Sequence, residues 1–102
     1  MSKDKRIRVV DLWIQALTVA PEDEVIAAAL RKQVREVQEF FAAVIRDGQA
    51  RGVVVADRDP VAEAWLFIAG GLLATMNSRL GGVLGDDLQR VRTERRRFML
   101  GE

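Results

Sequence analysis

The side chains best suited to acid–base or metal chemistry in this chain are carboxylates that occur in small groups. These groups are Asp57 with Asp59, Asp86 with Asp87, and residues 22–24. Each lies at the start of a predicted helix, where an acidic side chain stabilises the positive end of the helix dipole by about 0.3–1 kcal/mol. We therefore interpret these groups as helix caps rather than as catalytic acids and bases or metal ligands.

Other residue types that carry chemistry are missing from the chain. It contains no histidine and no cysteine, so the commonest general base, the commonest zinc ligand and thiolate chemistry are all absent. Neither a GxSxG nor a GxxxxGK motif occurs, and the glycines of the segment GGVLGDD follow no predicted strand. We expect no catalysis, no metal site and no cofactor.

Basic residues gather near the C-terminus, in the segment QRVRTERRRF. The cluster comprises Arg90, Arg92, Arg95, Arg96 and Arg97. Such a cluster could contact nucleic acid or an acidic partner, but the whole chain has a net charge of only +1. We favour an exposed helix face with cations near its negative end. Arg95 aligns with Leu88 and Val91, so we expect it to pair across an interface.

The segment AWLFIAGGLLATMNS, residues 64–78, has no charge in a chain that is 30% charged. A helix that packs on one side needs a polar outer face, and this helix would be apolar all round. We expect a second copy of the chain to cover it, whereas the alternative is the central helix of a monomeric bundle. The predicted interface on this helix consists of Phe67, Gly70, Gly71, Ala74 and Ser78.

A membrane-spanning role for this segment is not favoured. The continuous apolar run from Ala64 to Met76 is shorter than the ~20 residues that a bilayer requires. The basic N-terminal segment is followed by Asp11 rather than by a long apolar run, which argues against a signal peptide. We expect a cytoplasmic protein that does not contact a membrane.

Helical periodicity and helix-end signals predict an all-α fold. We expect one domain over residues 1–102, an antiparallel bundle of about four helices without strands. The expected helices are Lys5–Val19, Glu22–Arg51, Pro60–Leu80 and Asp86–Met99. Pro21 opens the second helix in this interpretation and Gly52 ends it, Asp59 caps the third and Asp86 caps the fourth. The valines at 53–55 have no strand to pair with and form a packed loop.

The second helix has a clear apolar stripe. The stripe consists of Ile26, Leu30, Val34, Val37, Phe41, Val44 and Gly48, and the opposite face carries Arg31, Arg35, Gln38, Ala42, Arg46 and Gln49. Gln33 departs from this pattern, because it lies on the inner side between Leu30 and Phe40. A buried amide needs hydrogen-bond partners, which are more often a neighbouring backbone than a ligand.

Aromatic and polar residues on different helices could line a pocket between helices, a common place for small ligands. The candidate ligand-binding residues are Trp13, Gln33, Phe40, Trp65 and Met76, with Thr75 or Asn77 as further polar groups. A solid core built from the same side chains is the alternative. The predicted ligand is a small apolar effector with one or two polar groups.

The order of motifs resembles the C-terminal domain of TetR-family transcriptional repressors. The resemblance covers about Leu12 to Leu80 and rests on the turn Gly48-Gln-Ala-Arg-Gly52, the helix start Asp57-Arg-Asp-Pro60 and the apolar helix from Ala64 through Gly71-Leu72. It implies an effector-binding and dimerisation domain with its pocket among the first three helices. It also implies that the last two helices pair with their copies, which adds Leu88, Val91 and Arg95 to the interface of a homodimer.

The same resemblance bears on DNA binding. Members of the family begin with a helix-turn-helix domain, and this chain has no room for one. The chain is then either a fragment or truncated product, or a dimerising domain that works alone, and we expect it not to read DNA by itself. A stand-alone helical interaction module, forming homodimers or mixed dimers without a small-molecule ligand, is the alternative function.

Overall fold

The computed structural model describes residues 3–101, and the side chains of residues 10–101. This part of the chain is all-helical, with no strand, which confirms the predicted fold class. Its elements are α1 (Lys3–Val19), the short 3₁₀ helix η1 (Ala20–Glu22), α2 (Glu24–Ala50), α3 (Pro60–Arg79) and α4 (Asp87–Leu100).

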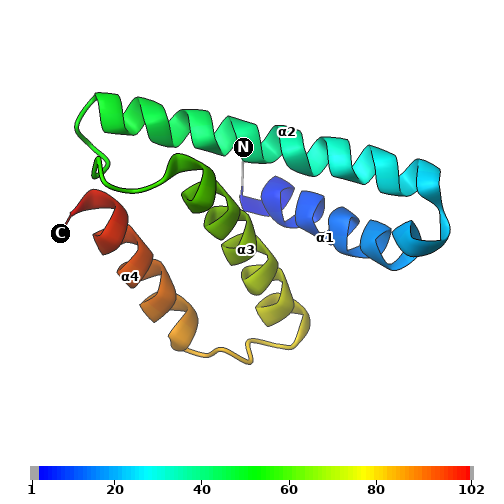
Figure 1. The fold of residues 1–102 in the computed structure, drawn as a ribbon. Coiled ribbons are helices and arrows are strands. Elements are labelled where there is room, and N and C mark those ends of the chain that lie inside the picture. Colours follow the sequence, from blue (N-terminus) through cyan, green and yellow to red (C-terminus); the bar gives the residue numbers. More distant parts are fainter. Residues whose placement is uncertain (1–2, 102) are drawn as a thin grey trace.

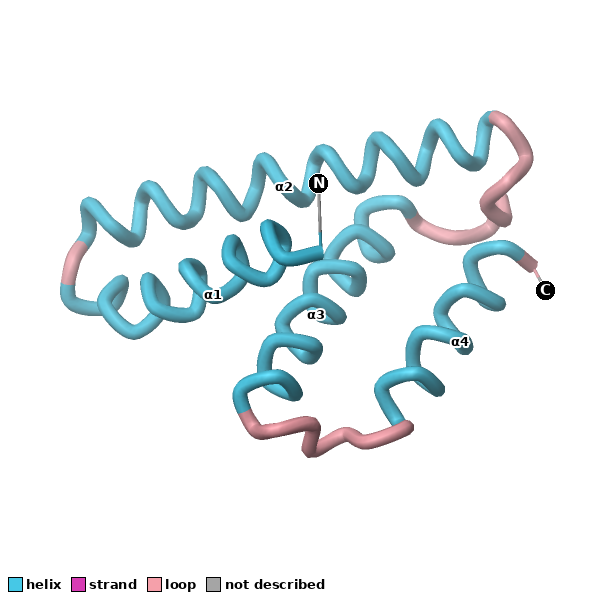
Figure 2. The backbone as a smooth tube through the Cα atoms, turned by 180° about the vertical axis from the view of Figure 1, so that it is seen from behind, coloured by secondary structure: helices cyan, strands magenta, loops and turns pink. Residues whose placement is uncertain are grey.

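The helices form a loosely closed bundle (Figure 1). α1 and α2 lie antiparallel and side by side, and α3 packs mainly on α2 and also on α1 (Figure 2). α4 runs alongside α3 in the opposite direction, and its C-terminal end approaches the loop that joins α2 to α3. The backbone of α4 has the fewest neighbours in the other helices, so side chains and the loop before α3 hold it in place.

Two helix ends agree with the sequence-based prediction. The Asp59 carboxylate accepts a hydrogen bond of 2.9 Å from the backbone N–H of Val61, and Pro60 occupies the first turn of α3. Gly52 follows α2 with a φ of +78°, in the left-handed region that glycine adopts without strain. These residue types alone therefore place the end of α2 and the start of α3.

Two other helix starts differ from the prediction. Asp23 caps α2 by accepting hydrogen bonds from the N–H groups of Val25 and Ile26, so Pro21 and Glu22 belong to η1 instead of α2. Asp86 makes no side-chain cap, because its own φ and ψ are helical and a capping residue must be extended.

The face of α2 that packs on α3 also differs from the predicted stripe. Its buried residues are Gln38, Ala42, Ile45 and Gly48, whereas Gln38 and Ala42 were predicted to face outward and Val44 inward. Small side chains at this crossing let α3 approach. At Gly48 it is the following loop that approaches, since a Cβ there would lie 2.7 Å from Cγ2 of Val54. Val44 is left exposed as a result.

The loop between α2 and α3 contains no strand, as predicted, and Val54 packs against the core, whereas Val53 is exposed instead of packed. The Gln49 amide donates hydrogen bonds to the carbonyl oxygens of Val55 (3.1 Å) and Arg58 (2.7 Å). The N–H of Val55 donates to the carbonyl oxygen of Met99 at 2.9 Å. The loop thus ties the C-terminal end of α4 to the rest of the molecule.

A single chain leaves much apolar surface uncovered. Its accessible surface is 7407 Å², whereas a compact monomer of this length exposes about 5,800 Å². The radius of gyration, 15.2 Å, exceeds the roughly 13 Å typical of a domain of this size. Only 22% of the apolar stretch of α3 is buried.

Candidate functional site

An apolar cleft of about 960 Å³ lies between α2, α3 and α4. Phe40, Phe41 and Val44 form its α2 wall, and Leu66, Phe67 and Gly70 contribute to its α3 wall. The α4 wall and the ends of the cleft are lined by Leu88, Val91, Arg92, Arg95, Arg96, Met99, Leu100 and Glu63, with Val10 of α1 at one edge. The volume falls in the range that small-molecule sites occupy.

Three phenylalanines form the aromatic side of the cleft. The ring of Phe41 lies 4.6 Å from that of Phe67 and 5.6 Å from that of Phe40, measured between centroids, in tilted and edge-on arrangements that aromatic rings prefer. Phe40 is 64% exposed and Phe67 is 56% exposed. An aromatic cluster this open in a single chain offers its faces to a ligand or to another protein surface.

The α3 wall is shallow because its residues are small. A Cβ added at Gly70 would meet no other atom within 4 Å, and one at Gly71 would lie 3.7 Å from Cγ2 of Val10. Glycine in the middle of a helix is destabilising by about 0.5–1 kcal/mol relative to alanine. No neighbour among the side chains of residues 10–101 requires a glycine at position 70, so the small residue leaves space open in the cleft.

One end of the cleft is closed by charged groups. Glu63, in the first turn of α3, is only 2% exposed. Its Oε1 accepts from Nε (2.9 Å) and Nη2 (2.5 Å) of Arg58, and its Oε2 accepts from Nη2 of Arg95 on α4. The Arg58 guanidinium also lies 4.4 Å from the ring centroid of Phe98. This group, which we call the Glu63 cluster, fastens α4 to α3 and to the loop.

A smaller pocket of about 590 Å³ lies between α1 and α2. Trp13 and Gln33 meet there, and Nε1 of Trp13 donates a 2.7 Å hydrogen bond to Oε1 of Gln33. The partner of Gln33 is therefore an indole, and not the neighbouring backbone that we expected. Trp13 is buried, whereas Gln33 lies at the surface and covers the indole N–H.

The five predicted ligand-binding residues do not meet in one cavity. Trp13 and Gln33 line the α1–α2 pocket, while Phe40 lines the larger cleft. The guanidinium carbon of Arg35 lies 5.9 Å from the ring centroid of Trp65. Trp65 lines neither pocket. Met76 is exposed and also lines neither. Of the further polar candidates, Thr75 is buried and donates to the carbonyl oxygen of Gly71, and the Asn77 Oδ1 accepts from the N–H of Leu84.

The predicted interface residues, by contrast, gather around one cavity. All of them except Ser78 line the cleft between α2, α3 and α4, and they are Phe67, Gly70, Gly71, Ala74, Leu88, Val91 and Arg95. Arg95 differs from its predicted role, because it pairs with Glu63 of its own chain rather than across an interface. The buried carboxylate of Glu63, on the neighbouring helix α3, supplies the opposite charge for Arg95.

The sequence did not predict the Glu63 cluster, and of the α2 wall of the cleft only Phe40 was predicted as a ligand-binding residue. Glu63 is the only charged residue between Pro60 and Ser78. A lone charge in an otherwise apolar helix was a signal that this residue has a buried partner. The exposure of Phe40 and Val44 had no comparable signal, because it depends on where α3 crosses α2.

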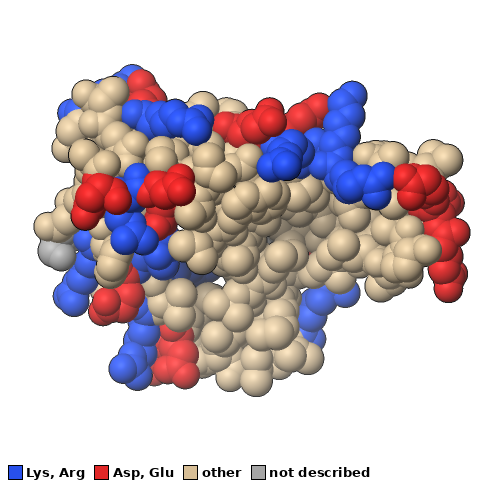
Figure 3. Space-filling model, viewed as in Figure 1, with Lys and Arg blue, Asp and Glu red and all other residues tan. Residues whose placement is uncertain are grey.

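The described residues supply apolar walls and paired charges rather than reactive groups. They contain no cluster of three or more carboxylates that could hold a metal ion. By length and composition alone α3 could cross a membrane, a test that core helices of soluble proteins also pass. Figure 3 shows a broad uncharged surface across the middle of one face, with charged side chains around it. No family model, curated protein or solved structure matches this chain.

Proposed function

We propose that this chain is a dimerisation and ligand-binding domain of a regulatory protein, and that it has no catalytic activity. The observation that carries the proposal is the uncovered apolar surface. The total accessible surface of the single chain, polar and apolar together, is about 1,600 Å² larger than that of a compact monomer of its length. If two copies each buried this excess, the interface would total about 3,200 Å², within the range of obligate homodimers.

The exposed apolar residues of α3 and α4 locate the proposed interface. Phe67 and Gly70 on α3 and Val91 on α4 are exposed and line the same cleft. The absence of a side chain at Gly70, where a Cβ would meet no atom of the described residues within 4 Å, gives a partner helix room to approach. In this arrangement the second copy covers the mouth of the cleft, and the apolar helix of each chain gains the second packing surface that it lacks alone.

The cleft also supports the ligand-binding part of the proposal. Its walls are aromatic and aliphatic, and its few polar groups are at Glu63, along α4 and at Thr75, whose hydroxyl donates to the carbonyl oxygen of Gly71. An apolar cavity with a small number of placed polar groups is the usual form of a small-molecule site. The α1–α2 pocket is a weaker candidate, because the polar groups of Trp13 and Gln33 already satisfy each other.

The resemblance to TetR-family C-terminal domains supports a regulatory role and a cytoplasmic location. In that family the DNA contact is made by a helix-turn-helix domain, so we propose that residues 1–102 do not recognise an operator. Any binding of duplex DNA through the α4 arginines should be unspecific and should weaken steeply with salt. The competing function is a stand-alone interaction module, which shares the interface and differs in binding no ligand in the cleft.

Substitution of one exposed phenylalanine tests the proposed interface. Phe67→Glu places a charge where the second copy is expected to pack, and an unpaired buried charge costs several kcal/mol. Size-exclusion chromatography with light scattering should show that this variant dissociates at concentrations where the wild type is dimeric. Val25→Glu is the matched control, since Val25 is 80% exposed and lies on α2 outside the cleft. Equal masses for the two variants would contradict the interface.

A further inference from the structure

The arginines of α4 fall into two groups by their partners. Arg90 and Arg97 pair with acidic residues one turn away on the same helix, Asp87 and Glu94, and Arg95 pairs with Glu63. Arg92 and Arg96 form no ion pair with any of the residues whose side chains the structure describes. These two arginines are also members of the cleft lining, whereas Arg90 and Arg97 are not.

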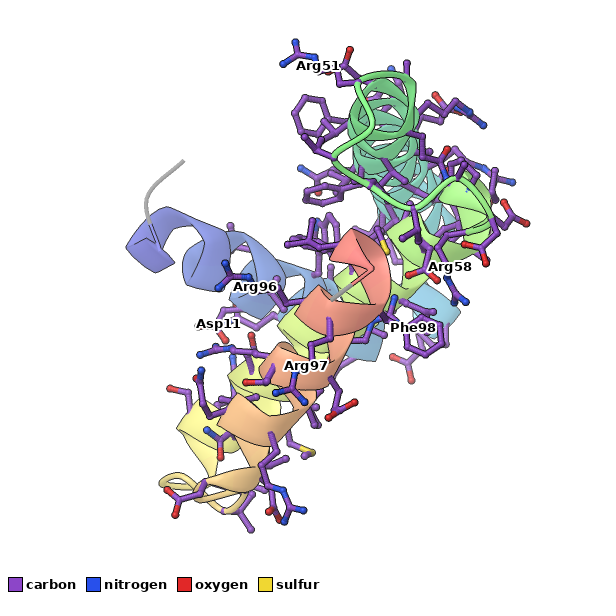
Figure 4. All side chains as sticks on the ribbon, turned by 90° about the vertical axis from the view of Figure 1, so that its left-hand side faces the viewer. Asp11, Arg51, Arg58, Arg96, Arg97 and Phe98 are labelled. Carbon is purple, nitrogen blue, oxygen red and sulfur yellow. The ribbon has the colours of Figure 1, made fainter. Side chains whose placement is uncertain are left out.

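Arg92 and Arg96 are four residues apart and therefore lie one above the other on the same face of α4. Two like charges at this spacing repel each other. Figure 4 shows Arg96 directed toward α1, while Arg97 points away from it and Phe98 lies with Arg58 on the other side of α4. The edge of the cleft that faces α1 therefore carries two guanidinium groups beside an apolar interior.

We propose that the cleft between α2, α3 and α4 binds an anionic amphiphile, a molecule with one aliphatic chain and a carboxylate or phosphate head group. The aliphatic chain lies against Phe40 and Phe41, and the head group accepts hydrogen bonds from Arg92 and Arg96. This inference rests on the ligand-binding part of the proposed function and names the class of ligand.

The chemistry of the cleft selects this class over other ligands. Guanidinium groups bind carboxylates and phosphates through paired, charge-assisted hydrogen bonds. Glu63 is already occupied by Arg58 and Arg95, so it is saturated and offers no free carboxylate to a cation. The remaining walls are apolar, which suits an aliphatic chain and leaves the many polar groups of a sugar or nucleotide without partners. One cationic edge and an apolar interior therefore match a ligand that is charged at one end only.

Isothermal titration calorimetry with three soluble probes of equal chain length tests the inference on the full chain. The probes are decanoate, decanol and decyltrimethylammonium, each kept below its micelle concentration. We expect decanoate to bind at least tenfold more tightly than decanol, and the cationic probe to bind most weakly. Decyl phosphate in place of decanoate shows which anionic head group is preferred.

Two double variants separate the role of charge from that of position. Arg92→Gln with Arg96→Gln should weaken decanoate binding at least tenfold and leave decanol binding unchanged. The matched control is Arg90→Gln with Arg97→Gln, which removes the same charge from the same helix outside the cleft and should leave binding of both probes unchanged. Circular dichroism checks that each variant retains its helices.

The outcomes distinguish this inference from the proposed function. Equal binding of decanoate and decanol, with no effect of the Arg92 and Arg96 substitutions, would overturn the anionic ligand and leave an apolar ligand site. Failure of all probes to bind would overturn both the inference and the ligand-binding part of the proposed function. Binding to vesicles of anionic phospholipid without binding of decanoate would overturn the inference in favour of a membrane surface. The dimer is measured independently in each case.

Discussion

The first turn of α3 and the middle of the same helix are built in opposite ways. In the first turn, Glu63 is buried and both of its oxygens are bonded to arginines from outside the helix. In the middle, from Trp65 to Met76, the side chains are almost all apolar and many of them are exposed. The charged part of the helix is complete within one chain, whereas the apolar part lacks a covering surface.

The difference between the two parts of α3 shows which side chains find their partners within one chain and which do not. A buried carboxylate must be paired within the fold, since leaving it without a partner is strongly destabilising. Exposed apolar surface costs free energy as well, but a partner that arrives later can cover it. We interpret the Glu63 cluster as the device that holds α4 in position while the cleft beside it stays open for a second copy and a ligand.

Removal of the buried charge should have the largest effect. Glu63→Gln leaves Arg58 and Arg95 close together without their shared anion, and it should lower the free energy of unfolding by about 3 kcal/mol. Chemical denaturation measures this value. Glu94→Gln is the control, because Glu94 forms an exposed pair with Arg97 and should cost less than about 0.5 kcal/mol. Similar effects for both substitutions would contradict the role of the Glu63 cluster.

Substitution at the α1–α2 contact should have an intermediate effect. Gln33→Leu leaves the indole N–H of Trp13 without its acceptor, and a buried unsatisfied donor costs about 1–3 kcal/mol. Urea denaturation followed by tryptophan fluorescence measures the loss. If the α1–α2 pocket is instead a ligand site, stability stays nearly unchanged, and that result would require a new account of this pair.

Substitution in the apolar part of α3 should change the free energy of unfolding least. In the monomer it should raise this free energy, whereas the two substitutions above lower it. Gly70→Ala adds a Cβ that meets no atom of the described residues within 4 Å, so it should stabilise the isolated monomer by about 0.5–1 kcal/mol through helix propensity. It should also weaken the dimer, because the partner helix loses its closest approach. Denaturation at low protein concentration measures the stability of the monomer, and sedimentation at high concentration measures the affinity of the dimer. A variant that dimerises as strongly as the wild type would argue against an interface at Gly70.

Helix ends could be predicted from the sequence where the end requires a particular residue type. Asp59-Pro60 and Gly52 define their positions by side-chain capping and by a positive φ, and the structure has them as expected. Asp86 has the right side chain and fails to cap, because its backbone is drawn into the helical conformation. The all-α fold follows from such local signals, which depend on few neighbours.

The candidate site could be predicted only in part, because it depends on how helices cross. The apolar character of residues 64–78 was sufficient to locate the α3 wall of the cleft. The predicted ligand-binding residues do not lie together, since α3 packs against Gln38, Ala42 and Ile45 of α2, of which the first two were predicted to face outward. The direction of that crossing exposes Phe40 and places Trp65 and Met76 outside both pockets. Periodicity within one helix carries no information about this angle.

The most direct test of the account is the mass of the wild-type chain in solution. Sedimentation equilibrium at micromolar concentrations measures it without assumptions about shape, which matters for a chain as extended as this one. We predict the mass of two chains, with dissociation only on dilution. A folded protein with the mass of one chain at every concentration would contradict the proposal that a second copy covers α3.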